Sequence, residues 1–215
     1  MNSVITVGRQ YGSCGREIGK RLACELGVAF YDKEKLKEVA VKMGAEDLML
    51  EAYGEKHAKS LLHSLAIGAY SFGYHEASHQ NPFSQKAYLL AFDVIKRVAR
   101  QGPCVIVGRC ADYVLEHDAQ CVNLFFHAPL PVRIKTIARR MKEDEAQAEE
   151  RIRTVDRLRR NYYNYYTNKI WGEMDSYHFA VDSSVYGVEA TARMLSQMLC
   201  VGEGIPTGNY SGSRN

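Results

Sequence analysis

Three glycines near the N-terminus are spaced in a way that could bind phosphate. Gly8, Gly12 and Gly15 follow the apolar run Val4–Val7 and precede a helical pattern that ends at Gly27. Glycines let a backbone curl so that successive N–H groups point at one anion, and a helix N-terminus adds to the attraction. The segment matches neither GxxxxGK[ST] nor GxGxxG, and no Lys stands in it. Phosphate binding and a tight strand-to-helix turn are therefore both open.

Two arginines flank this loop and could supply the positive charge that a lysine would give. Arg9 lies before the loop and Arg16 follows it, and guanidinium is a planar group that matches phosphate bidentately. If the loop binds an anion such as a nucleotide phosphate, we expect its binding residues to be Gly8, Arg9, Gly12, Ser13, Cys14, Gly15, Arg16 and Glu17.

Polar residues also follow two other apolar runs. Gly108-Arg109 comes after Cys104–Val107, with Asp112 close behind, and Asp32 follows a short run that ends at Tyr31. Strand ends of a parallel sheet meet at one edge, where ligands bind. We predict Arg109, Asp112 and Asp32 as substrate-binding residues. Arg109 could instead pair with a nearby Asp, and Asp32 could cap the helix that follows it.

Arginines are concentrated in one part of the chain. Residues 130–170 hold eight Arg and three Lys against six acids, a local charge of +5, so the rest of the chain sums to −2. Converging guanidinium groups are what phosphoryl transfer needs, because its transition state requires positioning and charge stabilisation. A solvated helix face is the alternative. We predict Arg139, Arg153 and Arg159 as catalytic arginines on a mobile lid.

Aromatic and histidine clusters are less informative. The tyrosines between Tyr162 and Tyr166 could stack on a base, pack inside the protein or contact a second subunit in a homodimer. His75 and His79 are four residues apart, but no third ligand follows nearby, so we predict no metal site there.

The elements that must position these residues alternate between strand and helix. Apolar runs predict strands at 4–7, 28–31, 104–107, 121–126 and 179–181, and helical spacing predicts helices at 84–100, 131–142, 149–160 and 188–199. This alternation predicts an α/β fold with a parallel sheet between two layers of helices. Residues 45–80 and the Arg/Tyr stretch after Met141 are expected to be additions to that core.

Composition limits the function classes. The 215 residues are 46% hydrophobic and 25% charged, which is typical of one globular domain with an insertion. The net charge of +3 is too small to favour a nucleic-acid partner. Six scattered cysteines, no signal-peptide pattern and no long apolar run predict a cytoplasmic protein without a membrane partner. The Gly-rich end at 202–215 is expected to be a flexible tail.

Several of these segments together resemble the cytidylate kinase-like family, relatives of the P-loop nucleoside monophosphate kinases. The resemblance rests on 5–19, 30–33, 106–113, the spaced set Asp156, Arg159, Tyr162, Tyr163, Tyr165, Tyr166 and Thr167, then Trp171-Gly172 and 177–184. It spans roughly Val4 to Leu199. It implies a P-loop three-layer fold over 1–201, with a helical monophosphate-binding insert at 45–80 and a lid with the Tyr-rich segment at 143–172.

The resemblance also implies an activity: transfer of the γ-phosphoryl of ATP, with Mg²⁺, to a nucleoside monophosphate such as CMP or dCMP. Arg109 would then contact the acceptor, and Arg16 would join the lid arginines in catalysis. The position of the Walker lysine falls on Gly15, and the hydroxyl that holds Mg²⁺ falls at Arg16 or Glu17. A nucleotide-binding regulatory protein without catalysis is the rival hypothesis, and a kinase for another small acceptor is a third.

Overall fold

The computed structural model describes residues 3–43 and 82–201. Within these residues, one sheet has the strand order β2-β3-β1-β4-β5, and every pairing is parallel. The predicted α/β fold with a parallel sheet is confirmed. The strands are β1 (Val4–Arg9), β2 (Ala29–Tyr31), β3 (Cys104–Val107), β4 (Cys121–His127) and β5 (Phe179–Asp182).

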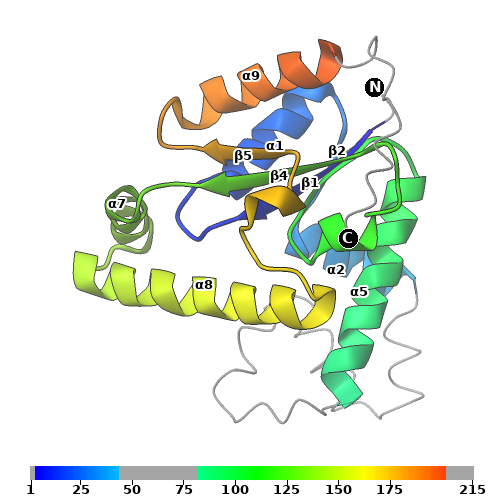
Figure 1. Cartoon of the computed structure of the whole chain (residues 1–215), viewed down its shortest axis with the longest axis horizontal. Helices are drawn as coiled ribbons and strands as arrows, with labels where there is room; N and C mark the ends of the chain where they lie inside the picture. Colours follow the sequence, from blue (N-terminus) through cyan, green and yellow to red (C-terminus); the bar gives the residue numbers. More distant parts are fainter. Residues whose placement is uncertain (1–2, 44–81, 202–215) are drawn as a thin grey trace.

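Helices cover both faces of this sheet (Figure 1). On one face lie α1 and α9, and on the other lie α2, α5 and α6, while α8 crosses below the sheet beside α7. The helices are α1 (Gly15–Leu26), α2 (Lys33–Lys42), α5 (Pro82–Arg100), α6 (Ala111–Val114), α7 (Leu130–Met141), α8 (Glu145–Thr167) and α9 (Gly187–Val201), with a 3₁₀ turn η2 (Met174–Ser176).

The alternating strand side chains form two cores. Ile5, Val7 and Leu124 pack with α1 and α9, whereas Val4 and Ile106 pack with α2, α5 and α6. Apolar side chains on both faces explain why β1, β3 and β4 occur as continuous apolar runs in the sequence. This order places β1 in the middle, so the loop after β1 begins at the centre of the sheet's carboxyl edge.

The structure extends two of the predicted elements. Strand β1 continues to Arg9, which pairs with Phe126 of β4, so Gly8 and Arg9 belong to the strand and the loop is Gln10–Cys14. Helix α8 was predicted as 149–160, and this was too short at both ends. A capping box begins it, in which Asp144 accepts from the Gln147 N–H while the Gln147 side chain accepts from the Asp144 N–H.

At its other end, α8 includes the tyrosines that the sequence left outside any element. Tyr163 is 5% exposed, and its ring is buried against the α6 side of the sheet. Tertiary burial therefore overrides the weak helix propensity of Asn and Tyr at this end of the helix.

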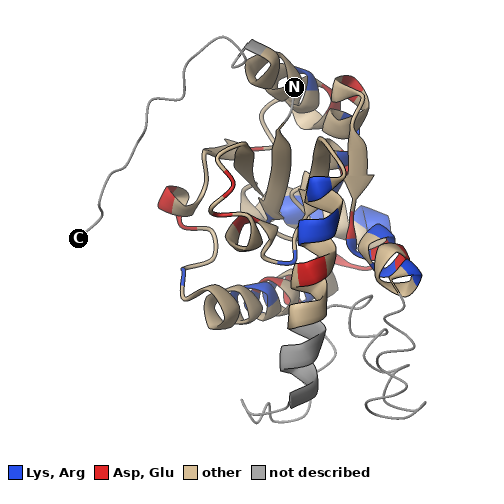
Figure 2. Cartoon of the chain, turned by 90° about the vertical axis from the view of Figure 1, so that its right-hand side faces the viewer, with Lys and Arg blue, Asp and Glu red and all other residues tan. Residues whose placement is uncertain are grey.

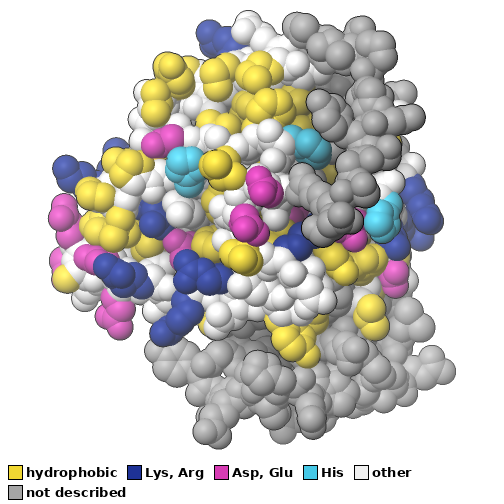
Figure 3. Space-filling view, viewed as in Figure 1, with side chains coloured by type: hydrophobic (Ala, Val, Ile, Leu, Met, Phe, Trp, Pro, Cys, Tyr) yellow, Lys and Arg dark blue, Asp and Glu magenta, His cyan; other side chains and the backbone are white. Residues whose placement is uncertain are grey.

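The basic stretch of the sequence, residues 130–170, forms α7 and α8. Figure 3 shows dark-blue side chains gathered there beside acidic ones. Figure 2, turned by 90°, also shows Lys and Arg next to Asp and Glu on the described helices. Predictions for the 45–80 insert, for His75 and His79, and for the tail at 202–215 fall outside the described residues.

Candidate functional site

The Gln10–Cys14 loop turns through two left-handed residues. Gly12 has φ 84° and Cys14, the N-cap of α1, has φ 56°. A Cβ on Gly12 would lie 3.0 Å from the Cβ and from the carbonyl oxygen of Arg133. The glycine at 12 is therefore required both by its backbone conformation and by the close approach of α7.

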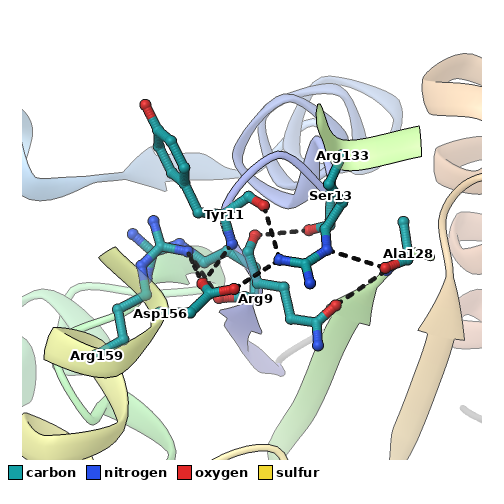
Figure 4. Close-up of polar contacts among 8 residues, drawn as sticks. Arg9, Tyr11, Ser13, Ala128, Arg133, Asp156 and Arg159 are labelled. Atoms are coloured by element: carbon teal, nitrogen blue, oxygen red, sulfur yellow. Dashed lines mark hydrogen bonds and ion pairs between the residues drawn. The ribbon is translucent and has the colours of Figure 1, made fainter. Parts of the chain in front are cut away.

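Side chains of α7 and α8 hold this loop (Figure 4). The Tyr11 N–H donates to Asp156 Oδ1 at 2.7 Å, and the Tyr11 carbonyl accepts from Arg133 Nη1 at 3.2 Å. Arg133 and Asp156 also form an ion pair at 2.6 Å, with both side chains about one-tenth exposed. Both backbone polar groups of Tyr11 thus bind a buried ion pair.

Further hydrogen bonds hold the ends of the loop in place. Arg133 Nε donates to the Ala128 carbonyl at 3.0 Å, and the Ala128 N–H donates to the Gln10 side chain at 3.2 Å. The Ser13 hydroxyl donates to the Gln10 carbonyl at 2.9 Å, and the Ser13 carbonyl accepts from the Ser183 hydroxyl at 2.6 Å. Ser13 is 1% exposed, so its hydroxyl serves the loop itself.

At the start of α1, the charged side chains are paired. Glu17 binds Arg140 at 2.8 Å, and Arg140 Nη2 also lies 3.8 Å from Cys14 Sγ. Burial raises the pKa of the Cys14 thiol, with the Glu17 carboxylate adding to the effect, so this side chain is a neutral thiol at neutral pH.

Arg16 and Asp32 connect α1 to α2. Arg16 Nη2 lies 2.5 Å from Asp32 Oδ2, and Asp32 caps α2 by accepting from the Lys35 N–H at 3.1 Å. Burial alone would raise the pKa of Asp32, but the Lys35 N–H and the Arg16 guanidinium hold it below its ordinary value. The helix cap that the sequence suggested for Asp32 is confirmed.

An open cavity of about 670 Å³ lies at the carboxyl ends of β1 and β3. Arg9, Arg109 and Arg159 line it from β1, the β3–α6 turn and α8, and Lys33 lines it from the start of α2. Several cations around an open space are suited to an anionic ligand.

The turn that carries Arg109 has an uncommon backbone. Gly108, Arg109 and Cys110 have φ values of 81°, 61° and 55°. Positive φ at consecutive non-glycine residues costs free energy, and such conformations concentrate at functional sites. The turn directs the chain from β3 into α6 beside the cavity.

Arg9 occupies space that two glycines leave open. A Cβ at Gly15 would lie 2.7 Å from the Arg9 Cβ, and a Cβ at Gly108 would collide with the Arg9 guanidinium. The Arg9 carbonyl accepts from Arg159 Nη1 at 2.9 Å. The Gly15 position therefore has no room for a side chain while Arg9 keeps this place.

Aromatic residues form the rest of the cavity wall. Tyr162, Tyr163, Trp171 and Tyr177 line it, and the Tyr163 hydroxyl donates to Asp112 Oδ2 at 2.6 Å. Burial raises the pKa of Asp112, and burial with the neighbouring carboxylate raises the pKa of Tyr163. Flat rings beside cations are suited to a ligand with both a ring and a phosphate.

The structure separates the predicted site residues into four groups. Gly8, Arg9, Arg109, Asp112 and Arg159 meet at the cavity. The loop residues Gly12, Ser13, Cys14, Gly15 and Glu17 contact α7, β4 or the Ser183 hydroxyl instead, while Arg16 and Asp32 pair with each other.

The other two predicted arginines lie elsewhere. Arg139 is exposed in the last turn of α7, and Arg153 is 68% exposed and pairs with Glu149 on α8. Asp156 and Arg159, three residues apart on α8, form an ion pair at 3.8 Å.

Sequence reasoning did not find four residues of this region. Arg133, Asp156, Tyr163 and Tyr177 were not among the predicted site residues. The spaced set that begins with Asp156 and Arg159 carried a signal for two of them, because these positions fall on one side of α8 facing the loop and the cavity. Nothing in the local sequence distinguishes Arg133 from the exposed arginines near it.

The structure also bears on metals and membranes. Within 3–43 and 82–201, no three His, Cys, Asp or Glu side chains are grouped as a metal site. In the same part of the chain, no helix is long and apolar enough to cross a membrane.

Comparison with known proteins gives the family. The model of the cytidylate kinase-like family matches residues 4–185. The chain belongs to the cytidylate kinase-like family. This membership supports a phosphotransferase in general terms, and it implies nucleotide substrates. No curated protein matches the sequence.

Solved structures share the fold. An uncharacterized protein from Eubacterium ventriosum ATCC 27560 is 22% identical, with a TM-score of 0.68 over 92% of this chain and 98% of that one. Shikimate kinase from Acinetobacter baumannii, in complex with shikimate, is 13% identical, with a TM-score of 0.50 over 95% and 96%. Shikimate kinase from Bacteroides thetaiotaomicron is also 13% identical, with a TM-score of 0.51 over 93% and 99%. At such identities the likeness concerns the fold alone.

Proposed function

We propose that this protein transfers the γ-phosphoryl group of ATP to a nucleoside monophosphate, with CMP or dCMP as the acceptor. The observation that carries the proposal is the cavity in which Arg9, Arg109 and Arg159 meet aromatic side chains. Guanidinium groups match phosphate oxygens, and rings match a base, so one cavity offers both parts of a nucleotide its complementary surface.

The arginines have separate roles in this proposal. Arg109 binds the acceptor phosphate from the β3–α6 turn, and Arg159 adds charge from α8. Arg9 reaches the cavity from the end of β1, and it supplies the charge that is missing at Gly15, where its Cβ leaves no room for a side chain. Positioning and charge stabilisation are the main requirements of phosphoryl transfer.

ATP binds, in this proposal, at the first turn of α1. The backbone N–H groups there have no partner within the helix and attract phosphate. Arg16 and Arg139 remain predicted catalytic residues, whereas the exposed ion pair of Arg153 with Glu149 argues against a catalytic role for that side chain.

Magnesium accompanies ATP, and it offsets the charge of the phosphates when bound. It usually keeps several waters and needs only one or two carboxylates besides the phosphates. Asp32 and Glu17 are carboxylates beside the first turn of α1, and each of them is paired with an arginine.

The rest of the proposal concerns organisation. We propose that 1–201 form one kinase-like domain, with a monophosphate-binding insert at 45–80 and a lid segment at 143–172, whose helix α8 is held at the loop and the cavity by Asp156 and Arg159. A cytoplasmic location agrees with six cysteines that are all free thiols.

A second candidate is a nucleotide-binding regulatory protein that does not catalyse transfer. It is favoured by a loop without lysine whose Tyr11 peptide is held by Arg133 and Asp156. This protein would bind a nucleotide in the same cavity and turn none over.

A coupled assay of ADP release with Mg-ATP and each of CMP, dCMP, UMP and AMP separates the two candidates. We expect turnover with CMP or dCMP and little with AMP. Calorimetry with ATP and with CMP alone accompanies the assay. Binding without turnover of any acceptor would overturn the kinase proposal in favour of the regulatory protein.

A further inference from the structure

The ion pair between Arg133 and Asp156 is unusual because it is buried and because it binds loop backbone. Arg133 comes from α7 and Asp156 from α8, and together they bind the N–H and the carbonyl of Tyr11. Each carboxylate oxygen has its own donor: Oδ1 accepts from Tyr11 at 2.7 Å and Oδ2 from Arg133 at 2.6 Å.

Stability alone does not account for such a pair. Removing two charges from water is costly, and apolar residues of similar size at such positions are often as stabilising or more so. What the pair adds here is a single position for the loop, since Tyr11 cannot shift without leaving a buried partner unsatisfied. Packing reinforces that position, because Gly12 lies against Arg133 and Tyr11 packs against the cluster of Ile137, Ala148 and Ile152.

The same helix reaches the cavity one turn later. Arg159 follows Asp156 by three residues, donates to the Arg9 carbonyl at 2.9 Å and lines the cavity. Its guanidinium also lies 5.4 Å from the centre of the Tyr11 ring. Successive turns of α8 therefore fix the loop after β1 and the end of β1 itself.

We propose that Arg133 and Asp156 are positioning residues that set the Gln10–Cys14 loop relative to the cavity for phosphoryl transfer. Neither residue touches the substrates; both act through the Tyr11 peptide. This inference rests on the proposed function, in which the α1 end of the loop holds ATP and the cavity holds the acceptor. A misplacement of about 1 Å between reacting groups costs about 100-fold in rate.

The first test is Asp156→Asn in the full-length protein. An amide has one acceptor oxygen for two donors, so Tyr11 or Arg133 loses its partner. We expect kcat to fall about 100-fold, with the KM for CMP changed by less than about threefold, because the cavity keeps Arg109. The matched control is Glu143→Gln, which removes a carboxylate from Arg151, itself 44% exposed on the same helix. This control is expected to keep wild-type kinetics.

The double variant Arg133→Met with Asp156→Leu separates positioning from folding. It leaves no buried charge unpaired, so we expect its Tm to exceed that of Asp156→Asn, while the Tyr11 backbone groups still lose their partners. Because neither new side chain binds the Tyr11 peptide, kcat is expected to stay low. A double variant with wild-type kcat would mean that the pair serves stability alone, and the proposal would be wrong.

Hydrogen exchange gives a measurement that needs no reaction. The Tyr11 amide is expected to exchange at least about 10-fold faster in the double variant Arg133→Met with Asp156→Leu than in Glu143→Gln, since only the double variant leaves the Tyr11 N–H without its acceptor. If the wild type transfers no phosphate, the proposed function fails while this exchange result still tests the loop position. Equal exchange in the two variants would overturn the positioning role, whatever the activity.

Discussion

The cavity and the Gln10–Cys14 loop are neighbouring regions whose arginines have different surroundings. Around the loop, arginines are engaged by carboxylates: Arg133 by Asp156, Arg16 by Asp32 and Arg140 by Glu17. At the cavity, Arg9, Arg109 and Arg159 line open space beside aromatic rings.

This contrast shows that the number of arginines does not locate a binding site. The sequence concentrates arginine in residues 130–170, yet of the eight there only Arg159 lines the cavity. Burial and ion pairing give arginine a structural role around the loop, whereas at the cavity the same residue type is a candidate ligand-binding residue.

The largest expected effect is at the cavity. Arg109→Ala removes charge-assisted hydrogen bonds to the acceptor phosphate, and we expect the affinity for CMP to fall about 100-fold. The affinity for ATP is expected to change by less than about threefold, since the loop is untouched. Calorimetry with each nucleotide checks both values. An unchanged affinity for every monophosphate would remove Arg109 from the acceptor site.

A comparison within α8 sharpens the contrast. Arg159 is 12% exposed and lines the cavity, whereas Arg153 is 68% exposed and pairs with Glu149. We expect Arg159→Ala to lower kcat/KM about 30-fold and Arg153→Ala to lower it less than about threefold, because exposed ion pairs contribute little. Steady-state kinetics decide this, and an equal loss in the two variants would place Arg153 in the reaction as the sequence predicted.

Two glycines of α1 differ in the space around them: Gly15 lies against Arg9, and Gly19 serves as the control. A Cβ at Gly15 would lie 2.7 Å from the Arg9 Cβ and 3.0 Å from the Phe126 Cβ, so we expect Gly15→Ala to lower the free energy of unfolding by about 1–3 kcal/mol and to weaken nucleotide binding. At Gly19 the nearest atom is a methyl of Val107 at 3.3 Å, and alanine favours a helix. Gly19→Ala should therefore stay within about 1 kcal/mol of the wild type. Urea unfolding measures both, and equal stabilities would show that α1 shifts away from β1 and β4 at no cost.

The smallest effect concerns pH. Burial raises the pKa of Asp112 above its ordinary value of 3.8, so the folded protein binds this proton more tightly than the unfolded chain does. This contribution to stability is complete below the unfolded pKa, and it is lost as pH rises through the folded pKa. Asp112→Asn carries no such proton. The stability difference between Asp112→Asn and the wild type is therefore expected to grow in favour of the variant as pH rises above 4 toward neutrality, in urea unfolding at a series of pH values. A constant difference would contradict the raised pKa.

The sequence by itself determined the α/β fold and the ends of several elements. The strand Cys104–Val107, the cap at Asp32 and the stop of α1 at Gly27 all follow from signals within a few residues. Apolar runs, capping side chains and glycine conformations act locally, so a linear reading can detect them. The prediction from local sequence ended α8 too early, because the burial of Tyr163 depends on distant parts of the chain.

Only the tertiary structure decided which charged residues belong together. Asp156 binds the N–H of Tyr11 across 145 positions, and Arg159 binds the carbonyl of Arg9 across 150. Such partners meet because α7 and α8 fold back against the carboxyl edge of the sheet, and no local pattern contains that geometry. The sequence therefore indicated phosphate chemistry through its glycines and arginines, while packing separated the arginines that hold the loop from those that line the cavity.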